Sequence, residues 1–599
     1  MEMRATEDID ISTDITPPLI PLSFSLLNSS LNIHPSPDFS TSLRLLLHHR
    51  PTLSGRIAGL LSNRHKLTSQ NDQLSHRIKV DAQALAAEIA NQCGHTEPND
   101  CVLEEATIAL CAVLTNAVEV QDNEGQNLGV AVFGPTFSWI NHSCSPNACY
   151  RFTFSSSSSS ESKLRIAPSI RNSQQVQVDD GVSCVGSEFA EEGEQSYGPR
   201  LIVRSIKRIK KGEEVTVAYT DLLQPKAIRQ SELWSKYRFN CCCKRCSALP
   251  FTYVDHALQE ISFSSHDLSR SCLNSNFFRD MVDRRLNEDI DDAISEYLSV
   301  GDPETCCKKL EKVLIQGLNE QLEGFEGKSN SRFMLHPLHH LSLNAYTTLA
   351  SAYKVRASNS LSVNSEVGRN RFEAFDLSRT SAAYSLLLAG STHHLFNSES
   401  SLIASVANFW MVAGESLLSL TRSSGWSEPI KVSEVSSNLF SITELKCSKC
   451  SLVDRFRTFI SNGQIRSADF ENLSIEFLRC VSDITQKVWS FLNNGCHFLK
   501  SCKDPIDFSW LMSTKNSNSM GVRVHVNKTD MSYSHESENC ICISEEHARA
   551  NIFHLGLHCL VYGGLLAIIC YGHNSHLASQ VQTILDPEQS FVYNFFAAF

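Results

Sequence analysis

The stretch that decides the fold is Asn-His-Ser-Cys-Ser-Pro-Asn at residues 141–147. Two further stretches follow it: Gly-Glu-Glu-Val-Thr-Val-Ala-Tyr at 212–219 and Phe-Asn-Cys-Cys-Cys-Lys-Arg-Cys at 239–246. Each stretch alone is a short motif with a real risk of a false match. The three stretches in this order along one chain form a more specific pattern than any one of them alone.

The last stretch contains a Cys-x-Cys-x-x-Cys pattern. Zinc at structural sites takes four tetrahedral ligands, often all thiolates, so three close cysteines need a fourth from elsewhere. We expect Lys244 and Arg245 to offset the negative charge of such a site. The alternative is a run of reduced cysteines without metal, and Cys242 inside the run leaves the choice of ligands open. The three cysteines of the pattern are Cys241, Cys243 and Cys246.

The ordered set resembles the SET domain with its post-SET zinc motif. The Arg-Gln-x-x-Leu-x-x-x-Tyr-x-Phe texture at 229–239 is most similar to the SMYD-type SET-domain protein-lysine methyltransferases, of the plant SET-domain-group class. The motif-bearing part covers about 104–246, and residues 1–15 add the first strand. The resemblance implies S-adenosylmethionine and Zn²⁺ as cofactors, with Cys144 as the fourth zinc ligand.

The resemblance also implies which residues face the cofactor. Asn141 and His142 would hydrogen-bond S-adenosylmethionine where the chain crosses itself, and Phe239 would stack on its adenine. Ser138 lies at another cofactor-facing position of the family, and Asn116 matches a family contact more weakly. His142 as an ordinary buried histidine is the competing interpretation.

Tyr219 would be the catalytic tyrosine, and Tyr237 a second wall of the channel that admits the substrate lysine. Alternation along a strand places Val215, Val217 and Tyr219 on one face. The reaction is an in-line displacement, in which alignment supplies much of the rate. An ordinary core tyrosine at 219 is the alternative, and we expect Glu213 and Glu214 to form a solvated hairpin end.

Two features depart from the family pattern. No Gly-x-Gly segment occurs near the start, where SET domains use glycine for close backbone approach to the cofactor. Cys93 is the only cysteine between residues 15 and 99, whereas the MYND zinc module of SMYD-type proteins carries seven cysteines and a histidine, so we expect this module to be absent.

The texture of the chain changes on either side of the motifs. Short β-rich stretches at 129–133, 148–154, 201–206 and 215–219 predict strands, and a six-serine run opens a stretch at 155–199 that we expect to be largely disordered. Apolar residues at helical spacing fill much of the chain after the cysteines. The predicted class is α+β: a SET-type β-fold with a post-SET zinc motif, then an all-α, TPR-like domain. The predicted domains are an N-terminal SET strand and linker at 1–30, a helical segment at the MYND position at 31–98, the SET core and post-SET motif at 99–246, and the helical domain at 247–599.

Composition narrows the class of protein. The 599 residues carry 53 Lys and Arg against 65 Asp and Glu, a net charge of −12, which disfavours a generally basic nucleic-acid binder. An apolar stretch at 19–27 is interrupted by proline and preceded by acidic residues, unlike a secretory signal. We expect reduced cysteines, and nuclear or cytoplasmic residence. Cys447, Cys450, Cys540 and Cys542 show no clear partners and are interpreted as structural thiols.

The predicted function is S-adenosylmethionine-dependent lysine N-methylation of histone or non-histone protein. The main alternative is a catalytically inactive SET scaffold that binds protein partners, such as chromatin or chaperone proteins, through its helical domain; a zinc-containing nucleic-acid binder is a third. No direct nucleic-acid or membrane partner is expected. The apolar segment at 555–572 predicts a buried helix, with a membrane span as the alternative because 18 residues is the lower edge of a spanning length.

Overall fold

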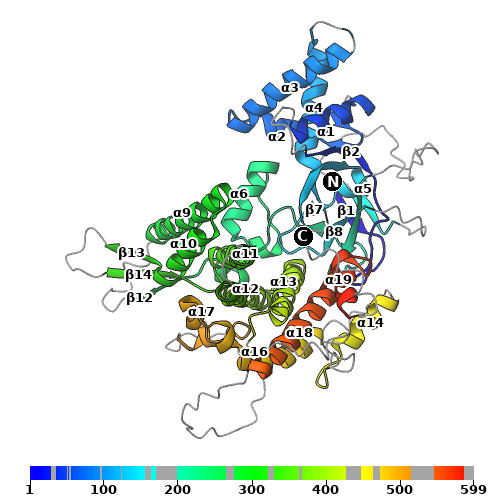
Figure 1. The fold of residues 1–599 in the computed structure, drawn as a ribbon. Helices are drawn as coiled ribbons and strands as arrows, with labels where there is room; N and C mark the ends of the chain where they lie inside the picture. Colours follow the sequence, from blue (N-terminus) through cyan, green and yellow to red (C-terminus); the bar gives the residue numbers. More distant parts are fainter. Residues whose placement is uncertain are drawn as a thin grey trace. The chain divides into compact units, whose positions relative to one another are not determined.

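The computed structural model describes residues 1–27, 36–49, 51–52, 55–92, 94, 97–122, 125–154, 164–169, 198–264, 276–321, 330–362, 367–426, 447–462, 472–514 and 545–585. It divides into two compact units. The first holds residues 1–252 with a short return at 568–577, and the second holds most of the rest. Figure 1 shows the elements of each.

The first unit is built from small, mostly antiparallel sheets. Its strands are β1 (Glu2–Ala5), β2 (Pro21–Leu26), β5 (Ala117–Gln121), β6 (Asn127–Phe133), β7 (Asn141–His142), β8 (Ala148–Thr153), β9 (Ile166–Ser169), β10 (Arg200–Ser205) and β11 (Thr216–Val217). The ladders are β1–β9, β2–β6–β5, β8–β10 and the parallel pair β7–β11.

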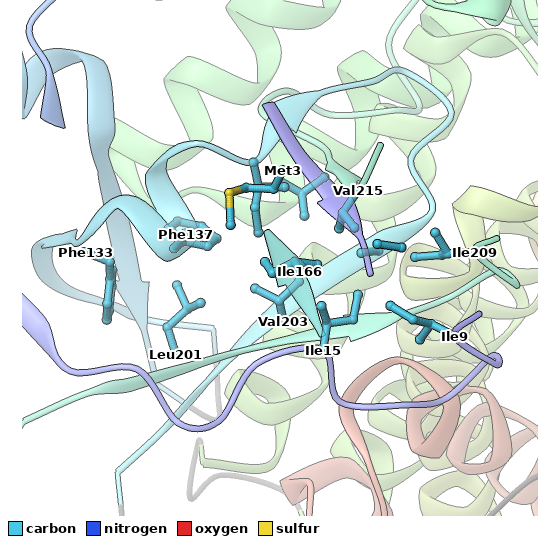
Figure 2. Close-up of a cluster of buried hydrophobic side chains, with 14 of the residues drawn as sticks. Met3, Ile9, Ile15, Phe133, Phe137, Ile166, Leu201, Val203, Ile209 and Val215 are labelled. Atoms are coloured by element: carbon cyan, nitrogen blue, oxygen red, sulfur yellow. The ribbon is translucent and has the colours of Figure 1, made fainter. Parts of the chain in front are cut away.

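One buried cluster joins these sheets. Ile9, Ile15 and Leu201 are fully buried in it, and Figure 2 shows them with Phe133 of β6 and with Val203, which shares β10 with Leu201. Residues distant in sequence thus share one apolar core, whose burial is the main favourable term in folding.

Residues 37–116 of this unit are mostly helical. The helices are α1 (Pro37–His48), α2 (Arg64–Thr68), α3 (Gln73–Gln92) and α4 (Asp100–Asn116), with the hairpin β3 (Arg56–Ile57) and β4 (Leu60–Leu61) between them. The helix α4 begins where the Asn99 side chain accepts a hydrogen bond from the backbone N–H of Val102 at 2.9 Å, a standard N-cap. The helical prediction for 31–98 missed that hairpin.

The described strands correct three further expectations. β9 lies inside the stretch 155–199 that was expected to be largely disordered, most of which is outside the described residues. β2 lies in the N-terminal segment 1–30, where a single strand and a linker were expected, so the apolar stretch interrupted by proline forms a second strand. β11 ends at Val217, so Tyr219 lies just past the strand, although it packs against the same core as Val215 and Val217.

The second unit is mostly helical. Its main helices are α9 (Asn276–Val300), α10 (Pro303–Gln316), α11 (His340–Ser362), α12 (Val367–Phe396), α13 (Ile403–Arg422), α14 (Leu452–Asn462), α16 (Leu473–Leu492) and α18 (Glu545–Tyr571), whose last residues belong to the first unit. The domain predicted at 247–599 is mostly helical, and it also contains a three-stranded sheet that the sequence did not predict. Its strands are β12 (Ile261–Ser264), β14 (Asn330–Leu335) and β13 (Leu318–Gln321).

Among the described residues, two helices are long and apolar enough to cross a membrane, Ser400–Arg422 and Glu545–Tyr571. Within the tested window of the second, 94% of the residues are buried, as in a core helix. The two helices approach closely at glycines: a Cβ on Gly414 would lie 2.7 Å from the backbone nitrogen of Leu560. Glycine is therefore required where the two backbones meet.

Candidate active site

The parallel pair β7–β11 brings the two decisive stretches of sequence together. Asn141 lies opposite Thr216 and His142 opposite Val217. The Asn147 side chain reinforces this pairing: its Nδ2 donates to the Glu214 carbonyl at 2.9 Å, and its Oδ1 accepts from the Thr216 N–H at 2.9 Å. Backbone and side-chain hydrogen bonds together fix the register of the site.

The His142 ring connects both stretches to the cysteine cluster. Its Nδ1 accepts a hydrogen bond from the backbone N–H of Tyr219 at 2.9 Å. That assignment leaves the ring proton on Nε2, which faces the Cys144 Sγ at 3.2 Å. Burial lowers the pKa of His142 to about 4, so the ring is neutral near pH 7 and can accept at one nitrogen while it donates at the other.

Aromatic side chains form a continuous wall beside this ring. The Tyr219 and Tyr237 rings lie 5.0 Å apart between centroids, and Phe239 lies 6.2 Å from both Tyr237 and His142. Phe239 and Tyr237 are half-buried, so part of each ring remains accessible. Aromatic ring faces pack well against a flat heterocycle, and the adenine of S-adenosylmethionine is such a group.

The Tyr219 hydroxyl donates to the Ile140 carbonyl oxygen. Burial, with the neighbouring Tyr237, Tyr150 and Glu214, raises the pKa of Tyr219 well above 10. The hydroxyl therefore stays protonated near neutral pH and acts as a fixed dipole rather than as an ionised base.

Four cysteines gather at the other side of His142. The Sγ atoms of Cys144, Cys241, Cys243 and Cys246 all lie within 4.8 Å of one another, and Cys144 and Cys246 are 3.4 Å apart. Cys242 is exposed and outside the group, which resolves the ambiguity in the sequence. Four sulfur donors at this spacing fit a tetrahedral zinc ion.

The positive charge in direct contact with the Cys144 sulfur comes from a residue that was not singled out in the sequence. Arg229 on α6 (Lys226–Tyr237) is fully buried, and its Nε donates to the Cys144 Sγ at 3.2 Å. Lys244, expected to share this task, is exposed, and the Arg245 guanidinium donates to the carbonyl oxygens of Cys144 and Leu222. The signal for Arg229 lay in the 229–239 texture, but only the fold shows the contact.

The remaining predicted cofactor residues have partners within the protein. Asn141 donates from Nδ2 to the Met1 carbonyl at 3.1 Å and to Glu214 Oε1 at 2.7 Å. Glu214 is therefore tied into the site, contrary to the expected solvated hairpin end. Asn116 donates to the Leu61 and Ala112 carbonyls, and Ser138 to the Phe133 carbonyl at 2.6 Å.

Comparison with known proteins identifies the family of this chain. The SET domain family model matches residues 2–220. Protein SET DOMAIN GROUP 41 of Arabidopsis thaliana is 38% identical over 97% of this chain and all of its own length. The chain belongs to the SET domain family.

More distant SET domain relatives carry enzyme names. Histone-lysine N-methyltransferase SMYD3 of Mus musculus is 24% identical over 34% of this chain and 36% of its own length. N-lysine methyltransferase SMYD2 of Homo sapiens is 24% identical over 36% of this chain and 39% of its own length. The chain thus matches little more than a third of the length of these two relatives.

Proposed function

We propose that this chain is an S-adenosylmethionine-dependent protein-lysine N-methyltransferase that acts on histone or non-histone protein in the nucleus or cytoplasm. The observation that carries the proposal is the position of Tyr219. Its backbone is held by His142 and its hydroxyl by Ile140, next to an aromatic wall and a four-cysteine cluster. The names of the SMYD relatives support the same reaction class.

S-adenosylmethionine, when bound, supplies an electrophilic methyl group. The chain supplies orientation: Phe239 offers a ring face to the adenine, and Asn141 offers an amide once it exchanges one of its present partners. Such positioning is a large part of catalysis for a displacement reaction.

The residues Tyr219 and Tyr237 would act on the substrate lysine. Their apolar ring surfaces disfavour the charged ammonium and so favour the neutral amine that can attack. The Tyr219 hydroxyl stays protonated, and its oxygen lone pairs can accept a hydrogen bond from the amine and hold it in line.

The test is methyl transfer by the purified full-length chain to histones and to a lysine-containing protein library, followed by mass spectrometry. Tyr219→Phe should lower turnover about 10²- to 10³-fold, the range seen when one oriented polar group is removed from an active site. Calorimetry should show unchanged S-adenosylmethionine binding in the variant, because the change removes one hydroxyl. Tyr150→Phe removes a hydroxyl from the same core outside the wall and serves as the matched control.

Two results would overturn parts of this proposal. Wild-type turnover in Tyr219→Phe would remove Tyr219 from its catalytic role. Absence of S-adenosylmethionine binding by the wild-type chain would favour the inactive scaffold, with the helical, TPR-like region as the part that binds partners.

A further inference from the structure

Three cysteines and a histidine meet in the second unit, at positions distant in sequence from the four-cysteine cluster. Cys447 and Cys450 lie in the turn before α14, Cys480 lies on α16 and His558 on α18. Their ligand atoms all lie within 4.8 Å of one another. Cys480 and His558 are buried, and the other two are half-buried. The Cys447–Cys450 pair, interpreted from sequence as partnerless thiols, therefore has partners; Cys540 and Cys542 lie outside the described residues.

The spacing matches what a tetrahedral metal requires. Zinc–sulfur and zinc–nitrogen bonds of about 2.3 and about 2.0–2.1 Å place a sulfur and a nitrogen ligand about 3.5 Å apart at the tetrahedral angle. The Cys450 Sγ and the His558 Nε2 are 3.5 Å apart. This pair already has the separation that a shared zinc ion would impose.

The histidine is oriented to bind through Nε2. Its Nδ1 lies 2.6 Å from the carbonyl oxygen of His554, one turn earlier on α18. A carbonyl only accepts, so the proton is on Nδ1 and the lone pair is on Nε2, toward the cysteines. Metal-ligating histidines usually carry this kind of support on the other nitrogen.

The cysteine turn repeats a detail of the first cluster. The Lys449 N–H donates to the Cys447 Sγ at 3.3 Å, as the Cys243 N–H donates to the Cys241 Sγ at 3.5 Å. In both turns the amide two residues after a cysteine points at its sulfur. Such a bond stabilises negative charge on the sulfur, and the thiolate is the form that binds metal.

Contacts outside the four ligands hold the turn on α16. Glu476 Oε1 accepts from both the N–H and the hydroxyl of Ser451, at 2.6 and 2.9 Å. Lys449 Nζ lies 3.2 Å from Asp483 Oδ2. Glu476, Cys480 and Asp483 share one face of the helix, because they are spaced at i, i+4 and i+7. The ligands are thus presented by a docked turn and two helices.

A third group of metal-ligating side chains is weaker. Asp283, His339 and His340 also lie within 4.8 Å of one another, but the Asp283 side chain is 48% exposed, and only three ligands are present. The group of Cys447, Cys450, Cys480 and His558 supplies all four ligands that a structural zinc ion requires, so it is the stronger candidate for a metal site.

We propose that Cys447, Cys450, Cys480 and His558 bind a structural Zn²⁺ ion in the helical unit. Three thiolates and an imidazole form a recognised tetrahedral set, and four protein ligands leave no open position for catalysis. The ion binds the thiolates and releases their protons to solvent. This site is separate from the four-cysteine cluster beside His142, so a full-length chain holds two zinc ions.

Zinc counting by native mass spectrometry of the full-length chain, purified without chelator, tests the proposal. The wild type should carry two zinc ions per chain. Cys447→Ser with Cys450→Ser should carry one, Cys243→Ser with Cys246→Ser should carry one, and the fourfold variant none. Lys449→Ala alters the same turn, keeps every ligand and should carry two. A wild type with one zinc that only the 243/246 change removes would overturn the proposal.

A second measurement needs no change in the helical unit. In the Cys243→Ser/Cys246→Ser chain, stripped of metal and reloaded with Co²⁺, one equivalent should give the intense tetrahedral and thiolate charge-transfer bands of a sulfur-rich site. Absence of these bands in the folded chain would overturn the proposal. Neither readout depends on methyl transfer, so failure here and failure of the proposed function are distinguishable.

Discussion

Replacement of Arg229 by methionine should loosen zinc in the four-cysteine cluster. A zinc ion with four thiolates has a net charge of −2, or about −0.5 per sulfur. Arg229 nitrogens lie 3.2 Å from the Cys144 Sγ and 4.0 Å from the Cys246 Sγ. At an effective dielectric constant of about 20, these contacts contribute about 2.6 and about 2.1 kcal/mol. The total agrees with the roughly 3–5 kcal/mol lost when one partner of a buried ion pair is removed.

The assay is competition for zinc against a chromophoric chelator in the full-length chain. A loss of about 4.7 kcal/mol corresponds to an affinity drop of about three-thousandfold. Lys244→Met removes the same charge from the cysteine turn at an exposed position, where water screens it, and should shift affinity less than about tenfold. Equal affinities for Arg229→Met and wild type would refute the reasoning that this guanidinium balances the cluster.

Two further predictions concern the helical unit. Burial lowers the pKa of His393 to about 3, and its Nδ1 accepts a hydrogen bond from the Trp410 indole N–H at 3.1 Å. Below pH 6.5 this histidine is therefore protonated in the unfolded chain but stays neutral in the folded chain. Between pH 7.5 and pH 5, this group should lower the free energy of unfolding by about 2 kcal/mol. Urea titrations of His393→Gln should show a fall in unfolding free energy over this pH range that is smaller by that amount. A fall equal to that of the wild type would contradict the prediction. Gly414→Ala should lower the stability of the unit by about 1–3 kcal/mol, because the new methyl group would meet the Leu560 backbone at 2.7 Å. Calorimetric unfolding measures this loss of stability. A variant more stable than the wild type would show that the two helices can move apart without a loss of stability.

The sequence predicted the parts of the site that are local. Residues 141–147, 212–219 and 239–246 carry the wall and one cysteine cluster because each contributes several neighbouring side chains. It did not predict Arg229 beside the sulfurs, because one arginine on a helix has no distinguishing spacing. It also missed the second cluster, whose ligands Cys450, Cys480 and His558 come from three separate segments that only tertiary packing brings together.

The fold shows the same division. The long helix α18 was expected from the apolar segment at 555–572, because a continuous apolar stretch of that length favours a buried helix. The strands β12, β13 and β14 are short, and the pairing of β12 with β14 joins residues far apart in the chain. Strand preference depends on neighbours that a single sequence does not reveal.

The single ring of His142 between the Tyr219 backbone and the Cys144 sulfur has a consequence for how this protein can evolve. A shorter or longer side chain would break one contact or the other, so neither can be adjusted separately. We expect positions 142, 144 and 219 to be kept or lost as a set across related sequences, because residues in contact co-vary. In a lineage that loses the metal, the histidine and then the tyrosine should vary, so loss of the cysteines would be an early marker for loss of the proposed activity.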